Sequence, residues 1–160
     1  MKKVLKKRTG FTLVELLIVI IIIGILAGAM LLVAGSGTDK AEATKIVSDL
    51  RSLKAAALMY YADNPSGKLS VASLDKYMDK KLDGEGDYLA GPASADTAWY
   101  VGRKVTGGSG VAEKLEAIKN DSTLYGLPTA PANDGATLAG SIPDDPDFVK
   151  THNFVYMRAR

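Results

Sequence analysis

The sequence contains one long apolar run with a single charge inside it. From Phe11 to Val33 the one ionisable side chain in these 23 residues is Glu15, and a helix needs about 20 residues to cross a bilayer. Five basic side chains and no acidic ones precede the run: Lys2, Lys3, Lys6, Lys7 and Arg8. Because basic flanks stay on the cytoplasmic side, we expect a membrane-spanning helix with the C-terminal part of the chain outside.

The basic character of the chain belongs to these first ten residues. The formal net charge of the 160-residue chain is +2, but from Phe11 onward there are 15 basic and 18 acidic side chains, a net charge of −3. This balance argues against nucleic-acid binding by the body of the protein. The absence of cysteine excludes disulfides, zinc–thiolate sites and a lipidated N-terminal cysteine.

Two ordinary explanations of the apolar run are a secretory signal peptide and a single-pass anchor. Ala27-Gly28-Ala29 would serve as a small-residue cleavage site for a signal peptide. Glu15 fits neither explanation, because an ionisable side chain near the middle of a membrane helix costs about 2.5 to 3.5 kcal/mol and usually marks function. A secreted or anchored binding module nevertheless stays as one alternative.

A partner for this carboxylate exists if the chain is cut after Gly10. The new α-amino group on Phe11 would then carry a positive charge at about the depth of Glu15. In a staggered array of parallel helices, each glutamate could pair with the amine of the neighbouring copy. This predicts assembly through the N-terminal helix.

The stretch from Lys7 to Leu17, KRTGFTLVELL, resembles the class III signal of type IV pilins and of the pseudopilins of type II secretion and competence systems. The resemblance implies that a membrane peptidase cuts after Gly10 and methylates Phe11, and that Glu15 guides subunit assembly. It also implies a set of partners: the prepilin peptidase and methyltransferase, an inner-membrane assembly platform with its ATPases, minor pilins, the lipid bilayer before assembly, and other copies of this chain in a helical filament.

The chain differs from many pilins about 22 residues after the cut. Those proteins carry a proline where the helix locally melts in the filament, and this chain has Leu32. Glycine is about 1 kcal/mol less favourable than alanine inside a helix, so the expected helix-melting positions are Gly24, Gly28, Gly35 and Gly37.

The helical pattern continues beyond the membrane segment as an amphipathic stripe. Apolar residues recur at three- and four-residue steps: Ile46, Leu50, Leu53, Ala57, Tyr60 and Tyr61. Asn64-Pro65-Ser66-Gly67 predicts the end of the helix. A helix from Phe11 to Asn64 would have 54 residues and a length of about 80 Å. The expected organisation is a leader (1–10), a transmembrane or filament-core helix (11–37), an amphipathic half (38–64) and a C-terminal domain (65–160).

The C-terminal domain is expected to be α+β, with a small antiparallel sheet packed on the long helix in a type IV pilin-like fold. Short helices are predicted from Ser70 to about Leu82 and from Val111 to about Lys119. Strands are predicted at Thr97–Val105, Leu124–Tyr125 and Phe154–Met157, and an irregular loop between Pro128 and Pro146.

One acidic motif suggests a metal. Asp83, Glu85 and Asp87 have the spacing of the first half of a calcium-binding loop, but Tyr88 stands at the sixth position, where that loop needs glycine, and Ser94 at the twelfth, where it needs glutamate. We therefore expect no metal site or cofactor from the residues themselves and keep these three carboxylates as calcium candidates. Resemblance to the major pseudopilins implies a calcium site somewhere in this domain.

Other chemistry is weakly represented. The single histidine, His152, cannot form a histidine-rich metal site and does not suggest a catalytic triad. Gly107-Gly108-Ser109-Gly110 lacks the Lys-Ser/Thr pair of a phosphate-binding loop. The aromatic residues Tyr60, Tyr61, Trp99 and Tyr100 are expected to pack against the long helix rather than to form an adhesive patch.

These patterns predict a structural protein and not an enzyme, with no catalytic residue. The first expectation is a type IV pilus subunit, which begins as an inner-membrane precursor and becomes part of a surface filament for adhesion, twitching motility or DNA uptake. The second is a major pseudopilin of a secretion or competence system. The third, of another class, is the anchored or secreted binding module.

Overall fold

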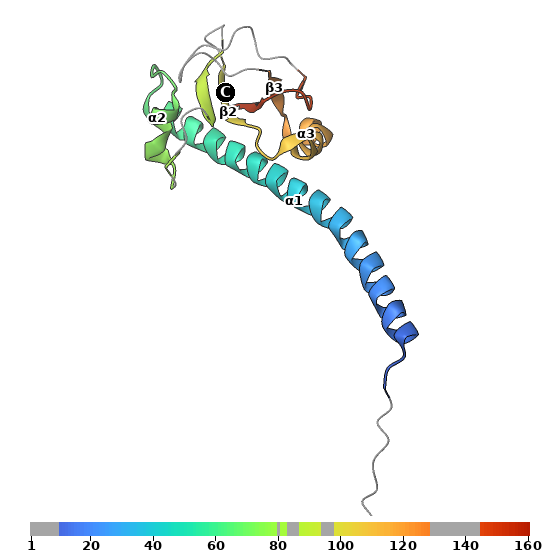
Figure 1. The fold of residues 1–160 in the computed structure, drawn as a ribbon. Coiled ribbons are helices and arrows are strands. Elements are labelled where there is room, and N and C mark those ends of the chain that lie inside the picture. The colour runs from blue at the N-terminus through green and yellow to red at the C-terminus, as the bar shows by residue number, and fades with distance from the viewer. Residues whose placement is uncertain (1–9, 80, 83–86, 94–97, 129–144) are drawn as a thin grey trace, which may run out of the picture. The chain divides into compact units, whose positions relative to one another are not determined.

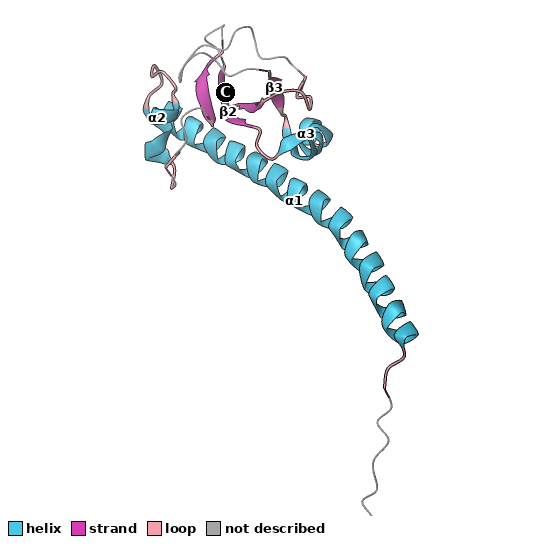
Figure 2. Ribbon diagram, viewed as in Figure 1, coloured by secondary structure: helices cyan, strands magenta, loops and turns pink. Residues whose placement is uncertain are grey.

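The computed structural model describes residues 10–79, 81–82, 87–93, 98–128 and 145–160, without the side chains of 32–34 and 36. It divides into two compact units, Met1–Gly37 and Thr38–Arg160. Figure 1 shows the elements in chain order, and Figure 2 distinguishes helices from strands. The predicted α+β architecture is confirmed: a long N-terminal helix is combined with a small antiparallel sheet.

Helix α1 spans Leu13–Asp63 without interruption, within two residues of the predicted start and one of the predicted end. It ends where the sequence turns: the Asn64 N–H donates to the Tyr60 carbonyl at 2.8 Å, and the Gly67 N–H donates to the Asn64 carbonyl at 3.0 Å. The Asn-Pro-Ser-Gly stretch therefore terminates the helix, as its turn-forming residues predict.

The second unit contains a four-stranded antiparallel sheet in the order β1-β2-β4-β3. Its strands are β1 (Tyr88–Pro92), β2 (Trp99–Lys104), β3 (Tyr125–Leu127) and β4 (Phe154–Arg158). The last strand in sequence lies inside the sheet: Val101 of β2 pairs with Met157, and Tyr125 of β3 pairs with Tyr156. Strand β4 therefore joins the β1-β2 hairpin to β3.

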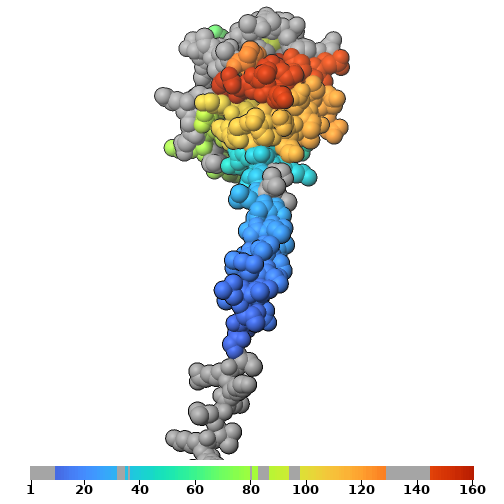
Figure 3. Space-filling model, turned by 45° about the vertical axis from the view of Figure 1, so that its right-hand side comes forward, coloured from blue at the N-terminus to red at the C-terminus, as the bar shows by residue number. Residues whose placement is uncertain are grey.

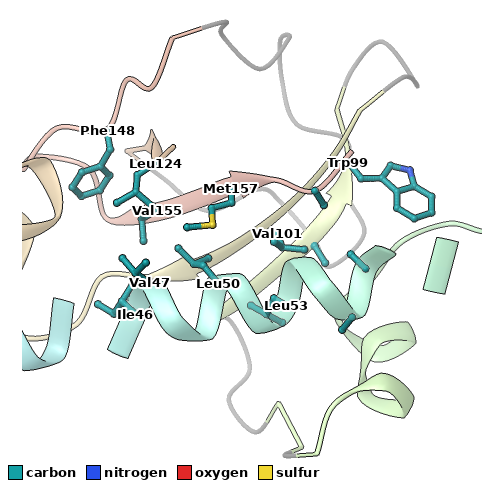
Figure 4. Packing of buried hydrophobic residues seen from close by; sticks show 14 of the residues in the cluster. Ile46, Val47, Leu50, Leu53, Trp99, Val101, Leu124, Phe148, Val155 and Met157 are labelled. Carbon is teal, nitrogen blue, oxygen red and sulfur yellow. The ribbon is translucent and has the colours of Figure 1, made fainter. Parts of the chain in front are cut away.

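The amphipathic half of α1 packs on one face of this sheet. Ile46, Leu50 and Leu53 have no exposed surface, and in Figure 4 they point toward β2 and β4. Alternate strand residues meet them, as expected from the two-residue period of a strand: Val101, Val155 and Met157 belong to the same buried cluster. The predicted helical stripe is thus the helix side of the main core.

The opposite face of the sheet carries a second buried cluster, rich in aromatic rings. Tyr156 lies between Tyr125, stacked at 5.3 Å, and Tyr100, edge-on at 6.0 Å, and Phe154 belongs to the same cluster. Burial raises the pKa of Tyr156 well above its usual value, and the nearby charge of Asp147 adds to the effect. This cluster keeps the outer sheet face apolar.

The short helices differ in length from the predicted ones. Ser70 caps α2 (Val71–Leu74) in a reciprocal capping box with Ser73, but the helix passes into the 3-10 turn η1 (Asp75–Tyr77) and ends there, because the backbone at Met78 is extended. The predicted end at Leu82 was therefore too late: the Leu82 N–H instead donates to the Asp75 carboxylate at 3.3 Å.

Helix α3 spans Gly108–Ala117 and is followed by one further turn, α4, at Lys119–Ser122. The sequence predicted a single helix from Val111 to Lys119, so the observed start lies three residues earlier. Gly107 precedes α3 with φ of 96°, the left-handed region that favours glycine. The predicted loop between Pro128 and Pro146 lies almost wholly outside the described residues.

The core packing gives a test of stability. Leu50→Ala should lower the free energy of unfolding by about 2 to 5 kcal/mol, because it removes a fully buried side chain from the helix–sheet core. Urea unfolding of the full chain in mild detergent, followed by the fluorescence of the one tryptophan, Trp99, measures the change. Leu58→Ala is the matched control, since Leu58 on the same helix is 46% exposed, and it should change stability by about 0.5 kcal/mol or less. Equal effects of the two variants would contradict the packing.

Candidate functional site

The first turn of α1 is closed by Thr12 and Glu15. The Thr12 N–H and the Thr12 hydroxyl both donate to Oε2 of Glu15 at 2.8 Å, and the Glu15 N–H donates to Thr12 Oγ1 at 3.2 Å. This reciprocal arrangement is a capping box, in which residues three apart satisfy each other's free backbone N–H groups at a helix start. Glu15 therefore has a local structural role in addition to its charge.

These hydrogen bonds do not neutralise the Glu15 charge. Among the residues that the structure describes, the ion pairs lie elsewhere in the chain and none includes Glu15. The positive end of the helix dipole favours a carboxylate in the first turn, by about 0.3 to 1 kcal/mol at an exposed site. That is less than the cost of placing the charge in lipid, so a cation from outside this part of the chain would stabilise it.

The helix beyond this turn is apolar around its whole circumference. Within the described part of the chain, one helical stretch is long and apolar enough to cross a membrane, Leu13–Leu31, and none of it is buried. On the face that Figure 3 shows, these residues (blue) form a column of side chains that no other described segment covers. Such a surface needs lipid or other apolar helices around it.

The Gly10–Phe11 peptide bond precedes the helix. Residues 10–12 have no helical or strand structure, and the Phe11 side chain is 86% exposed. A Cβ built on Gly10 would meet no other atom within 4 Å. The predicted cleavage site is therefore accessible, in backbone that is neither helix nor strand, just before the helix begins at Leu13.

The four glycines at the expected melting positions lie inside the continuous helix. Gly24, Gly28, Gly35 and Gly37 are all helical, as is the backbone of Leu32. No other residue lies within 4 Å of the position a Cβ would take at any of the four glycines. Local melting in a filament stays a prediction.

Just after these glycines, α1 acquires contacts within the second unit. The Asp39 carboxylate lies against Gly110 in the first turn of α3, a place where a helix dipole favours negative charge. Gly110 is also the last residue of the glycine-rich stretch that begins at Gly107 and forms the start of α3. The helix is therefore fixed from Asp39 onward by the folded unit.

Arg103 of β2 strengthens this attachment. Its guanidinium contacts Asp49 and lies 3.6 Å from the Glu42 carboxylate, and the Arg103 side chain is only 11% exposed. The Thr106 hydroxyl donates to the same Glu42 side chain at 3.3 Å. Sequence reasoning missed this group, because its members are more than 50 residues apart in the chain.

The aromatic residues are core, as predicted. Trp99 and Tyr100 are buried, and the Tyr61 ring meets Trp99 edge-on at 5.3 Å, with Tyr60 at 6.0 Å. The Tyr60 hydroxyl donates to the Lys68 carbonyl at 3.1 Å. Trp99, Tyr60 and Tyr61 thus attach the end of α1 to the sheet. Tyr100 instead belongs to the cluster on the opposite face of the sheet, beside Tyr156, so the expectation that it packs against the long helix was wrong.

His152 has a structural environment in the described chain. Its Nδ1 accepts from the Val149 N–H at 3.3 Å, and its ring meets Phe148 edge-on at 6.0 Å. The imidazole covers Gly126 so closely that a Cβ there would collide with it. This glycine of β3 is therefore required for close packing.

The calcium candidates are only partly described. Asp83 and Glu85 lie outside the described residues, while Asp87 precedes β1 and its carbonyl accepts from the Lys104 N–H at 2.8 Å. No cluster of three or more metal-ligating side chains occurs among the described residues. Calcium binding by the motif is untested.

The chain is similar to known proteins over parts of its length. Residues 5–31 match the family model described as the prokaryotic N-terminal methylation motif. The type II secretion system core protein G of Vibrio cholerae is 42% identical over 64 residues, which cover 40% of this chain and 43% of that protein. The core protein G of Aeromonas hydrophila is 36% identical over 75 residues, covering 47% and 52%. The chain thus spans about half the length, or less, of these curated relatives.

A similar solved structure is the major type IV pilin PilA1 from Clostridium difficile. It is 22% identical, with a TM-score of 0.46, and the match covers 78% of this chain and 98% of that one. The sequence comparisons establish that this chain carries the N-terminal methylation motif, and that part of its sequence resembles type II secretion core proteins G. The predicted resemblance to the pilin and pseudopilin class is confirmed to that extent.

The capping box gives a second test. Thr12→Val removes the hydroxyl that bonds Glu15 in both directions and should weaken the first turn by about 1 kcal/mol. Amide exchange of Glu15 and Leu16 in detergent micelles should then be about fivefold faster. Thr12→Ser keeps the hydroxyl and is the control. Unchanged exchange in the valine variant would show that the hydroxyl does not hold this turn.

Proposed function

We propose that this chain is a prepilin-type structural subunit, cleaved after Gly10, methylated on Phe11 and assembled into a helical filament through its apolar helix. The observation that carries the proposal is the uncompensated carboxylate of Glu15 in the first turn of an uncovered apolar helix, immediately after an accessible Gly–Phe bond. In an ordinary anchor that charge would only cost free energy in the lipid. In an array of parallel helices it could pair with a cation of the neighbouring subunit.

Cleavage would create the missing cation. Cutting after Gly10 leaves a charged amine on Phe11, which stays positive after methylation. In a staggered neighbour this amine would reach Glu15, whose Oε2 is already oriented by Thr12. The apolar surfaces of Leu13–Leu31 would at the same time leave lipid for the filament core.

The precursor would lie in the cytoplasmic membrane with the folded unit outside, in accordance with the basic residues before the helix. Processing would require a prepilin peptidase and methyltransferase, and assembly would require a membrane platform, minor pilins and separate ATPases. We propose a structural and not a catalytic role for the chain itself.

Two kinds of filament fit this proposal. A type IV pilus, acting in adhesion, twitching motility or DNA uptake, is the first. A secretion pseudopilus is the second, and one observation favours it: the matches to type II secretion core proteins G extend over 58 to 75 residues, well beyond the motif itself. Deleting the gene and scoring both surface fibres and exported proteins separates the two, because a pilus subunit affects the fibres and a pseudopilin affects export.

The processing step is tested by mass spectrometry of the mature N-terminus. We expect a chain that begins with methylated Phe11, and Gly10→Val should leave the uncut precursor in the membrane, because the added side chain blocks the peptidase site. A natural chain that begins at Met30, just past the signal-peptide-like Ala27-Gly28-Ala29, or an uncut Met1, would instead support the secreted or anchored binding module and overturn the prepilin proposal.

The assembly charge is tested by Glu15→Gln. Glutamine keeps a side-chain oxygen for the Thr12 N–H, so the capping box and cleavage should survive, while the charge is lost. Filament yield, measured by shearing and immunoblot, should fall at least tenfold. A tenfold change corresponds to a loss of about 1.4 kcal/mol from one subunit contact. Thr12→Ser is the matched control and should assemble normally. Normal yield from the glutamine variant would defeat the charge-pairing mechanism.

A further inference from the structure

A basic hollow lies at one edge of the second unit, where three distant segments meet. Lys54 comes from α1, Thr123 and Tyr125 from the junction of α4 and β3, and Arg158 to Arg160 from the end of β4. The hollow has a volume of about 360 Å³. None of its lining residues takes part in the N-terminal motif.

The hollow concentrates positive charge, and no acidic side chain lines it. Its three cations are Lys54, Arg158 and Arg160, and its lining contains no Asp or Glu. Within the described ranges, none of the three forms an ion pair with an acidic side chain. The three cations give the hollow a charge of +3. If the main chain of Arg160 is counted as a carboxylate, the net charge is +2, and a bound anion would offset it.

Packing and hydrogen bonds hold the two arginines in place. The Arg160 guanidinium lies 4.1 Å from the centre of the Tyr61 ring and 5.8 Å from that of Trp99. Nε of Arg158 donates to the Arg160 main-chain oxygen at 3.2 Å, and the Trp99 N–H donates to the same oxygen at 3.2 Å. These contacts restrict the exposed side chains of Arg158 and Arg160 before any ligand arrives, which lowers the entropy cost of binding.

We propose that this hollow binds a phosphate group. A phosphate monoester carries a charge of about −1.5 to −2 at neutral pH and offers three acceptor oxygens, which matches a hollow lined by three cationic side chains. Arginine forks bind phosphate oxygens in pairs, while lysine supplies a point charge. The volume exceeds that of a single anion, since a water molecule occupies about 30 Å³, so the phosphate can carry a further group. The inference does not depend on the proposed filament.

The test is a titration of the full chain in zwitterionic detergent with inorganic phosphate, at constant ionic strength, against chloride. Fluorescence of Trp99 reports binding because Arg160 lies on that ring. Saturable binding is expected, and the double variant Lys54→Ala, Arg158→Ala should bind at least about tenfold more weakly. Arg158→Lys keeps the charge and loses the two-pronged guanidinium, so its affinity for phosphate should lie between those of the wild type and the double variant. Arg160 is left unchanged because its guanidinium is part of the aromatic packing.

A matched control separates a site from the general field of the protein. Lys104→Ala with Lys114→Ala removes the same number of charges from exposed positions outside the hollow and should change the affinity by no more than about twofold. Thermal unfolding of each variant confirms that the fold is intact. A response that does not saturate, wild-type affinity in the Lys54/Arg158 variant, or equal losses in both double variants would overturn the proposal.

The source of the phosphate is then identified with a short single-stranded DNA, with and without a 5′-phosphate. Preference for the phosphorylated strand supports a monoester ligand at this site. Equal binding of both strands, lost in the Lys54/Arg158 variant, supports a phosphodiester polymer. Binding of inorganic phosphate without either strand supports a small phosphorylated molecule.

Discussion

The rest of the structure depends on one constraint: a single continuous helix has two different surfaces along its length. Over Leu13–Leu31 it is apolar on every side and none of it is buried. From Ala43 onward it buries one stripe and leaves its other faces to solvent. The described chain does not bury the apolar surface of the first half. The sheet packs against the apolar stripe of the second half and buries it. The same helix is thus both the core of a folded unit and an element that requires an external apolar environment.

The polar contacts around the helix follow this division. At its start, Thr12 and Glu15 satisfy backbone groups locally but leave a charge without a counterion in the described chain. In the folded unit, the Arg103 guanidinium instead contacts the carboxylates of Glu42 and Asp49, which lie on different turns of the helix. The Arg103 side chain is largely buried. Losing one partner of such a half-buried cluster is costly, since the remaining charge stays desolvated. The charge at the start is therefore available to a cation from outside the described chain, and the charges farther along stabilise the folded unit.

Sequence periodicity predicted the features of the fold that depend on local patterns, and few of the features that depend on distant residues meeting. The stripe of Ile46, Leu50 and Leu53 and the end of the helix followed from three- and four-residue spacing and turn residues. Strand β1 was not predicted: it contains Gly91 and Pro92, which are uncommon inside strands, although proline is tolerated on an edge strand such as this one. The Thr12 to Glu15 capping box was not predicted, although Thr-x-x-Glu is its sequence signature. The hollow of Lys54 and Arg158 could not be predicted, since its residues meet only through the fold.

The interior position of β4 has a consequence for the order in which the sheet forms. Its backbone supplies ladder partners to β2 on one side and β3 on the other, and Val155 and Met157 complete the layer over the long helix. Until Phe154–Arg158 is in place, both neighbouring strands have open edges, the kind of surface through which chains aggregate. Under the proposed export, this segment must therefore cross the membrane before the sheet can close, and the domain would pass through a stage in which its helix is formed and its strands are not yet joined.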